Sequence, residues 1–291
     1  MEIKNLGFGL QSTPKDERDF QFGAFFSLPK PEELPEEFEV GKPLGIKDQG
    51  TTDFCAGFAS AAVIEDHEGI FIIPEFIFSI AKELSGADPN SWGSDLRSIC
   101  KAITKVGAVD FTHLSEDMVK MLQNPDLARD PSNWPKLIRD KAKQHIQLSY
   151  FKVTGSYGTC DNFRATMWAN REEKRSILTG VVWNSEWTAA PGGVIDFKGT
   201  PAFGHALKVF GWKKINGVVH LKAQLSNGDS IGDKGVFYFS KDVVDELFTF
   251  GGFTFKDMPR EDIEKKSPNW FVALLKELAS FVKDLFSVDY K

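Results

Sequence analysis

The order of the secondary-structure patterns restricts the fold most, because helical periodicity fills the first half of the chain and strand patterns fill the second. From Cys55, apolar residues recur at i, i+3, i+4, i+7 and i+8, which predicts a buried helix that ends at about residue 65 or 68. Two more helices are expected to begin at Pro74 and Ser94. After Tyr150, short runs of β-branched and aromatic residues alternate with turn residues. Helices followed by strands, without βαβ alternation, indicate an α+β fold with two unlike lobes and a cleft between them.

These patterns divide the chain into four segments. Residues 1–45 contain five prolines and no sustained period, so we expect an extended N-terminal arm that lies on the body. Residues 46–150 are expected to form a helical lobe, and residues 151–260 a lobe of β-strands. Residues 261–291 are expected to form an amphipathic C-terminal helix, because apolar side chains share one helical face there. Three docking surfaces stay open for that face: the protein's own body, a protein partner or second copy, and a membrane surface.

Composition excludes several classes of partner. Thirty-five basic and 41 acidic residues give a net charge of -6, which provides no attractive field for nucleic acid or an anionic membrane. The most apolar internal run is interrupted by Pro74 and Glu75, so no membrane span is expected. The first residues lack the apolar stretch of a signal peptide, and an odd number of cysteines, three, suits a reducing compartment. We therefore expect a cytoplasmic protein that is not exported by a classical signal.

One cysteine and one histidine stand out by their positions. Cys55 lies in the first turn of a predicted helix, where the helix dipole favours a thiolate, and a Gln-Gly turn at Gln49 precedes it by six residues. Of the five histidines, only His205 lies in a motif, on a predicted strand. By contrast, Cys100 lies on the inner stripe of its helix and Cys160 has no evident partner. No zinc, Walker, dinucleotide or serine-hydrolase motif is present, so we expect no metal and no cofactor.

Three blocks of sequence resemble the papain family of cysteine peptidases. Residues 46–55 (IKDQGTTDFC) resemble the stretch that opens the family's central helix. Residues 203–212 (FGHALKVFGW) resemble the strand that carries the family's base, and residues 225–238 (LSNGDSIGDKGVFY) resemble its third block. The blocks follow one another in the family's order. The resemblance implies the papain-like two-lobe fold, in which a helical lobe and an antiparallel sheet or barrel lobe enclose a cleft.

The resemblance also implies roles for single residues. Cys55 would be the nucleophile and His205 its base, while Gln49 would donate its side-chain amide to the oxyanion. The family orients its histidine with an Asn, but the ungapped match places Leu225 at that position. Asn227 projects from the same face of the predicted strand and reaches the imidazole if the chain bulges locally. The sequence leaves open whether Asn227 or no residue orients His205.

Candidate substrate contacts follow from the same resemblance. Trp92 and Gly93 lie near the family's glycine-rich substrate strand, although a turn before a helix explains them equally well, and Gly204 precedes the base. The two tryptophans that shield the family's imidazole are replaced by Asn227 and Ile231. We therefore expect a less shielded imidazole and a reduced activity.

The leading hypothesis is a papain-like cysteine endopeptidase that hydrolyses peptide or protein substrates through a Cys-His thiolate pair and an acyl-enzyme. The alternative is a structural or peptide-binding protein on the same fold with an impaired site. A reduced, unsecreted chain of this kind is similar to papain-like proteins of bacteria and bacteriophages, some of which are virion components, so association with a virion is a further hypothesis. The sequence does not decide whether the arm covers the cleft.

Overall fold

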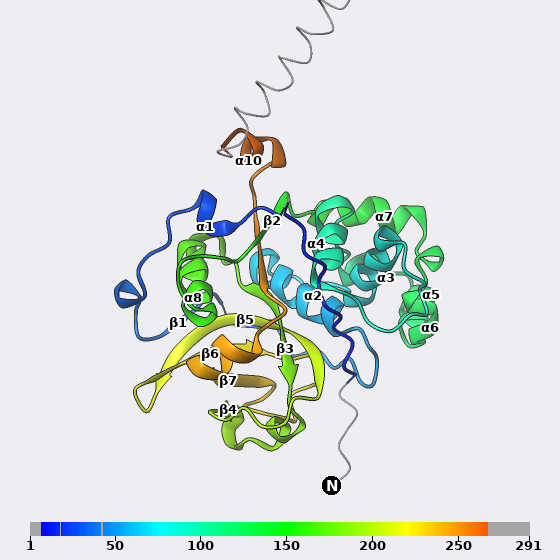
Figure 1. Ribbon diagram of the computed structural model, residues 1–291. Helices are drawn as coiled ribbons and strands as arrows, with labels where there is room; N and C mark the ends of the chain where they lie inside the picture. Colours follow the sequence, from blue (N-terminus) through cyan, green and yellow to red (C-terminus); the bar gives the residue numbers. More distant parts are fainter. Residues whose placement is uncertain (1–6, 18, 42, 267–291) are drawn as a thin grey trace, which may run out of the picture.

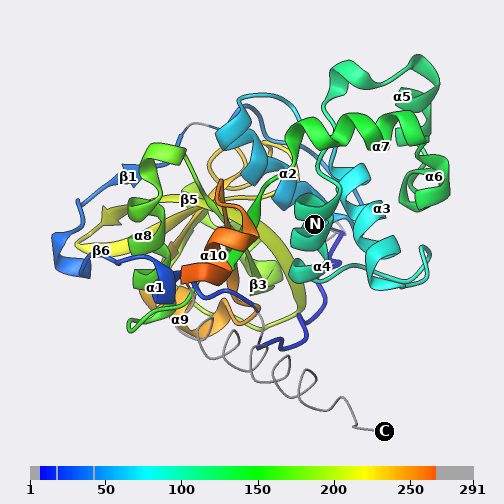
Figure 2. The ribbon, with the colours of Figure 1, turned by 90° about the horizontal axis from the view of Figure 1, so that it is seen from above.

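The computed structural model describes residues 7–17, 19–41 and 43–266, which form two lobes of different composition. Helices fill one lobe, on the right of Figure 1, and a twisted sheet fills the other. Figure 2 shows the same separation from above, with α5, α6 and α7 far from the strands. The α+β fold expected from the sequence is therefore confirmed.

Helix α2 (Cys55–Glu68) lies where the two lobes meet. It packs against α3 (Pro74–Ser85) and α4 (Leu96–Lys105) on one side and against strands β3 and β5 of the sheet on the other. From Cys55 to Ile64 its residues are small or apolar all round and are buried, as a helix covered on both sides requires, and Glu65 is buried as well. It ends at Gly69, whose left-handed φ of 70° places its N–H on the Glu65 carbonyl.

The other helices of this lobe are shorter. α4 begins at Leu96, because Asp95 accepts hydrogen bonds from the N–H groups of Arg97 and Ser98 and so caps the helix one residue after the predicted Ser94. The lobe is completed by α5 (Glu116–Leu122), α6 (Pro125–Arg129) and α7 (Lys136–Ala142).

The sheet has eight strands, of which seven follow one path in the order β2-β8-β3-β5-β6-β7-β4, while β1 pairs with β5. Every pairing is antiparallel except that of β4 with β7. The strands are β1 (Phe38–Glu39), β2 (Ser149–Lys152), β3 (Ile177–Trp183), β4 (Val194–Ile195), β5 (Phe203–Ile215), β6 (Val218–Gln224), β7 (Val236–Ser240) and β8 (Gly252–Lys256). The short runs that predict strands after about residue 148, LSYFKVT, ILTGVVWN, FGHALKVFGW, GVVHLKAQL and GVFYFS, correspond to β2, β3, β5, β6 and β7, although β5 continues past its run to Ile215. Strand β8 and the two-residue strands are additions.

Two helices that the sequence did not predict cover the sheet. α8 (Thr159–Ala169) and α9 (Lys241–Leu247) contact each other, and they pack on β5 and on β6 and β7 respectively. Short helices α1 (Phe22–Phe25) and α10 (Arg260–Lys266) lie outside the sheet. The sheet encloses with α8 and α9 a core that includes Trp183, Trp187 and Trp212, and another core lies around α2, α3 and α4.

The N-terminal segment has little regular structure and lies along the boundary between the lobes, where it is dark blue in Figure 1. The predicted amphipathic C-terminal helix, residues 261–291, falls largely outside the described residues, so its docking surface stays a prediction. Among residues 7–17, 19–41 and 43–266, no helix combines the length and the apolar character that crossing a membrane demands.

Candidate active site

Cys55 is the first residue of α2, and its side chain is completely buried. Phe54 precedes it as the N-cap and provides no side-chain hydrogen bond, so the first N–H groups of the helix stay available. The backbone groups of Gly9, Ala56 and Ala206 lie around the thiol and lower its pKa in part. Because Ala206 follows His205 on β5, the nucleophile candidate and the base candidate lie on adjacent elements whose backbones meet at the thiol.

His205 lies on β5 opposite Val181 of β3, and its ring is also completely buried. Trp183 packs edge-on against the imidazole at a centroid distance of 5.7 Å, and Phe8 of the N-terminal segment packs on it at 5.6 Å. The expectation of a poorly shielded imidazole is therefore wrong. The imidazole is shielded because a tryptophan of the neighbouring strand β3 packs against it, whereas the sequence led us to look for one among residues 225–238.

Gln49 lies in the loop before α2, and 96% of its surface is buried. Its Nε2 donates to the carbonyl oxygens of Gly7 and Thr52, both at 2.7 Å, and its Oε1 accepts from the hydroxyl of Ser226. Its backbone N–H also donates to the Ser226 carbonyl at 2.8 Å. The side-chain amide thereby donates to one carbonyl of the arm and to one carbonyl of its own loop.

Asn227, the candidate for orienting His205, pairs with the loop that carries Gln49. An isolated antiparallel bridge joins Asn227 to Asp48, and the Gly228 N–H donates to the Lys47 carbonyl. The side chain of Asn227 interacts with the His205 ring. Leu225, at the ungapped family position, is instead buried in the apolar core of the sheet.

Residues 7–11 of the arm pass over Cys55 and are held by both lobes, with an isolated bridge between Leu10 and Ser94. From the helical lobe, the Ser94 N–H donates to the Gly9 carbonyl at 2.9 Å and the Ser94 carbonyl accepts from the Gln11 N–H at 3.0 Å. From the sheet, the Gly204 carbonyl accepts from the Leu10 N–H at 3.3 Å. These bonds form a ladder on two edges, which is how an extended peptide adds to a sheet.

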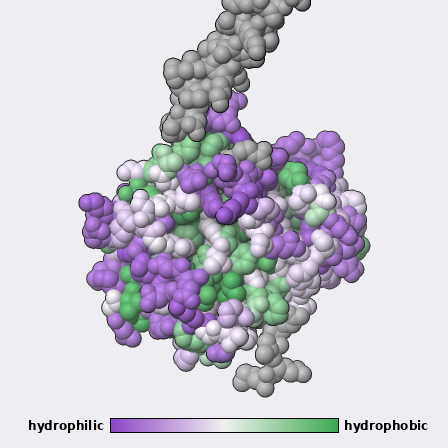
Figure 3. All heavy atoms as spheres, in the orientation of Figure 1, coloured by the Kyte–Doolittle hydropathy of each residue, from purple (hydrophilic) through white to green (hydrophobic). Residues whose placement is uncertain are grey.

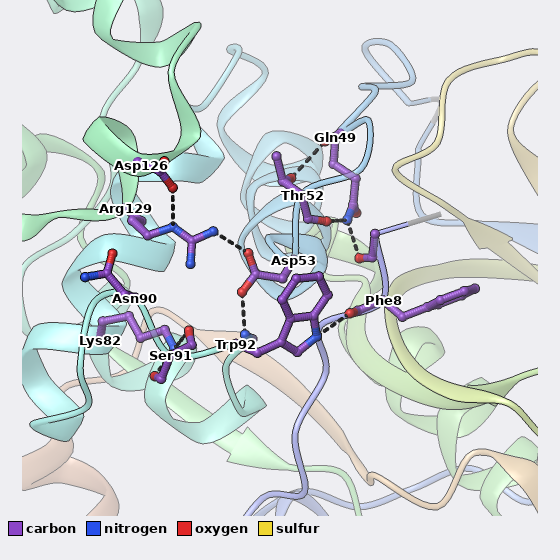
Figure 4. A network of polar contacts seen from close by, with 12 residues as sticks. Phe8, Gln49, Thr52, Asp53, Lys82, Asn90, Ser91, Trp92, Asp126 and Arg129 are labelled. Carbon is purple, nitrogen blue, oxygen red and sulfur yellow. Dashed lines mark hydrogen bonds and ion pairs between the residues drawn. The ribbon is translucent and has the colours of Figure 1, made fainter. Parts of the chain in front are cut away.

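Side chains complete this arrangement. Trp92 Nε1 donates to the Phe8 carbonyl at 2.6 Å, as Figure 4 shows. The Phe8 ring stacks on Phe203 at 5.1 Å. Gly93 has a φ of 66°, and a Cβ there would lie 1.8 Å from the Gly9 carbonyl oxygen, so only glycine lets the two backbones approach. The predicted contacts Trp92, Gly93 and Gly204 thus all lie against the arm.

Leu10 occupies an apolar pocket that the sheet provides. It is 8% exposed, and it packs where glycine at positions 180 and 204 leaves room beside Phe250. In Figure 3, hydrophobic side chains gather along the middle of this face, where Figure 1 places the segment between the lobes. The arm therefore fills the cleft with both its backbone and its side chains.

The buried thiol and imidazole are both held in their neutral forms. Burial raises the pKa of Cys55 to about 11, and the negative charge of Asp53 adds to this rise, while backbone hydrogen bonds oppose it. Burial lowers the pKa of His205 to about 4, although the interaction with Asn227 raises it in part. At neutral pH the arm-covered site therefore holds a thiol and an uncharged imidazole.

Several residues of this site were not predicted from the sequence. Asp53, which is buried, and Arg129 form an ion pair next to the nucleophile candidate, and Phe8 and Gly9 contact the candidate pair directly. The triplet Gly7-Phe8-Gly9 is the one sequence signal for the arm contact, since glycines around an aromatic residue permit close approach of the backbone. Within the described ranges, His, Cys, Asp and Glu side chains form no group of three that could hold a metal ion.

Solved structures with a similar fold were found by comparison. Xylellain, a cysteine protease from Xylella fastidiosa, matches with a TM-score of 0.70 and 18% identity, over 88% of this chain and 97% of that one. Digestive procathepsin L 3 of Tenebrio molitor matches with a TM-score of 0.62 and 13% identity, over 87% and 76%. Bromelain from Ananas comosus matches with a TM-score of 0.53 and 16% identity, over 77% and 99%. No family model and no curated protein sequence matches. The chain has the fold of the papain-like cysteine proteases.

Proposed function

We propose that this chain, built on the papain-like protease fold, is a cysteine endopeptidase with Cys55 as nucleophile and His205 as base. His205 takes the proton from the Cys55 thiol, and the thiolate attacks the carbonyl carbon of a peptide bond. The C–N bond breaks, the amine leaves with the proton from His205, and water then hydrolyses the thioester and restores the thiol. Gln49 Nε2 and the N–H groups at the start of α2 stabilise the oxyanion, and Asn227 orients the imidazole.

The observation that carries this proposal is the fit of a peptide backbone beside the thiol. Gln49 Nε2 donates to the Gly7 carbonyl at 2.7 Å, while the Gly9 backbone lies close enough to the thiol to lower its pKa in part. A main chain is thus bound on two edges with a carbonyl on the candidate oxyanion donor. A peptide or protein substrate needs the same backbone recognition.

The arm is also the reason that this form is latent. Cys55 and His205 are completely buried beneath it, and a substrate backbone would compete with residues 7–11 for the hydrogen bonds of Ser94 and Gly204. Displacement of the arm admits water and substrate, which removes the main cause of both pKa shifts. The proposal therefore includes a latent form with the arm bound and an active form with the arm displaced.

A single substitution in the full chain tests both parts. A Cβ at position 9 would lie 2.1 Å from the backbone oxygen of Asp53, so Gly9→Val expels the arm, whereas Gly41 has open space around its Cβ position and Gly41→Val is the matched control. With a fluorogenic peptide library at pH 7, we expect Gly9→Val to hydrolyse peptides at least ~10-fold faster than the wild type. We expect Gly41→Val to match the wild type, and the double variant Gly9→Val/Cys55→Ala to be inactive.

The second candidate is peptide binding without turnover, which Leu225 at the family's Asn position favours. If Gly9→Val binds a peptide but does not cleave any library member, this alternative replaces the endopeptidase. Hydrolysis that persists in Gly9→Val/Cys55→Ala would show that Cys55 is not the nucleophile.

A further inference from the structure

Asp53 lies two residues before the nucleophile candidate, and its carboxylate is completely buried. One oxygen, Oδ1, accepts from Nη2 of Arg129 on α6 at 2.8 Å, and the other, Oδ2, accepts from the backbone N–H of Gly93 at 2.5 Å. Figure 4 shows the carboxylate between the Arg129 guanidinium and the loop that carries Trp92. Burying a carboxylate without partners costs free energy of folding. Asp53 is tolerated at this position because each of its oxygens accepts a hydrogen bond.

Both partners of Asp53 belong to the peptide-binding surroundings of the thiol. The Arg129 guanidinium lies over the ring of Phe54, the N-cap of α2, at 5.2 Å. Gly93 lies between Trp92 and Ser94, whose donors hold the backbone of the arm. The carboxylate therefore joins the start of the nucleophile helix to the edge on which a peptide backbone pairs.

A second buried cation holds the same edge from α3. Lys82 is 2% exposed, and its Nζ donates to the backbone oxygen of Ser91 at 2.7 Å and to its hydroxyl at 2.8 Å. The three cysteines of the chain, all among the described residues, are free. The edge at residues 91–94 is thus fixed to the helical lobe by charged hydrogen bonds and not by a disulfide.

We propose that Asp53 and Arg129 are positioning residues, whose buried ion pair holds residues 91–94 at the distance from Cys55 that places a bound peptide's carbonyl on the thiol. This inference rests on the proposed function. A misplacement of about 1 Å at a reacting centre costs on the order of 100-fold in rate, so a small shift of this edge has a large effect on peptides. The same shift has no effect on a reagent that does not bind the edge.

The charge of Asp53 separates this role from a general loss of structure. Its negative charge adds to the raised pKa of Cys55, so Asp53→Asn removes one obstacle to thiolate formation. The amide of the variant also lacks the charge that binds Arg129 and Gly93. We therefore expect thiol reactivity to be kept or increased while peptide positioning is lost, which are effects of opposite sign.

Two reagents measure these effects separately in full-length Gly9→Val protein. Iodoacetamide reports the thiol alone, and a leucyl peptide with an epoxide group reports the thiol together with peptide positioning. We expect Asp53→Asn to slow the peptidyl epoxide by ~10- to 100-fold and to leave iodoacetamide unchanged or faster. Asp126→Asn is the control, because Asp126 lies 3.9 Å from Arg129 Nε but is 88% exposed, and we expect neither rate to change.

Arg129→Lys provides a second variant, which keeps a positive charge beside the Asp53 carboxylate. The positioning role can therefore be tested even if Asp53→Asn does not fold. The loss of the planar guanidinium is expected to slow the peptidyl epoxide by several-fold and to raise the KM for peptides more than it lowers kcat. Equal slowing of both reagents, or no slowing of either, would overturn the positioning role. If the Gly9→Val parent reacts with neither reagent, the proposed function is wrong, and the role of the ion pair is withdrawn with it.

Discussion

At the scale of single residues, the site is defined by a thiol and an imidazole that are both buried away from solvent and both uncharged. Neither Cys55 nor His205 has any exposed surface, and burial is the largest cause of the pKa shift of each. Aromatic rings, Trp183 and Phe8, lie against the imidazole. A charged imidazole is therefore disfavoured in the folded, arm-covered protein, which has a measurable consequence for stability.

We predict that His205 makes the fold sensitive to mild acid. Its pKa is about 4 in the folded protein and 6.5 is the ordinary value, so the unfolded chain binds the proton first as pH falls. The stabilisation is fully present above pH 6.5 and is lost as pH falls towards 4. Between pH 7.5 and 5, wild type should lose about 2 kcal/mol more of its unfolding free energy than His205→Gln. Urea unfolding at the two pH values measures this difference, and equal losses would contradict it.

At the scale of elements, the arm is anchored beyond the cleft by a buried ion pair with α4. Arg97 pairs through Nη2 with Asp19, donates through Nε at 2.9 Å and 3.0 Å to the same carboxylate, and also binds the Pro14 carbonyl. The hydroxyl of Tyr150 on β2 donates to Asp19 at 3.3 Å. Residues 7–11 thus lie between the lobes, while α4 holds Pro14 and Asp19 and β2 also holds Asp19.

We predict that Arg97→Met loosens the arm and destabilises the fold by about 3–5 kcal/mol, because it leaves the Asp19 carboxylate buried and unpaired. Limited proteolysis with mass spectrometry should place the earliest cut before residue 20, and urea unfolding should give the loss of stability. Lys136→Met removes an exposed pair with Asp140 and is expected to change neither measurement. A first cut elsewhere in the chain would refute the anchoring role.

The sequence predicted those elements whose signals are local. The periodicity from Cys55 predicted α2 because that helix is buried over many turns, and the motif around His205 predicted β5. It did not decide between Leu225 and Asn227, because the pairing of Asn227 with Asp48 joins segments that are far apart in the chain. Contacts of this kind depend on tertiary structure and leave no periodic trace.

The same limit explains the other omissions at the site. Trp183 shields His205 only because the register of β3 with β5 brings the two together. Arg129 reaches Asp53 from a helix 76 residues away. No spacing rule predicts either contact. The proposed association with a virion likewise stays a prediction.

At the scale of the whole molecule, the two lobes meet on α2 and β5, which carry the candidate nucleophile and base. Lys208 of β5 and Asp66 of α2 form an ion pair at 2.8 Å in which both side chains are 1% exposed. It lies three residues along β5 from His205 and eleven along α2 from Cys55, so it holds the two elements together away from the cleft. The lobes are thus fixed to each other, and the arm is the element between them that we expect to move.

The central claim is that burial beneath the arm is the main cause that keeps an otherwise competent Cys-His pair in its neutral form. The most direct test is the pH dependence of iodoacetamide labelling at Cys55, located by mass spectrometry, in full-length wild type, Gly9→Val and Gly9→Val/His205→Ala. We predict that wild-type labelling rises only as pH approaches about 11, and that Gly9→Val is labelled well below pH 8.5, the rough pKa of a free thiol, in a manner that needs His205. Identical profiles for wild type and Gly9→Val, or labelling indifferent to His205, would contradict the account.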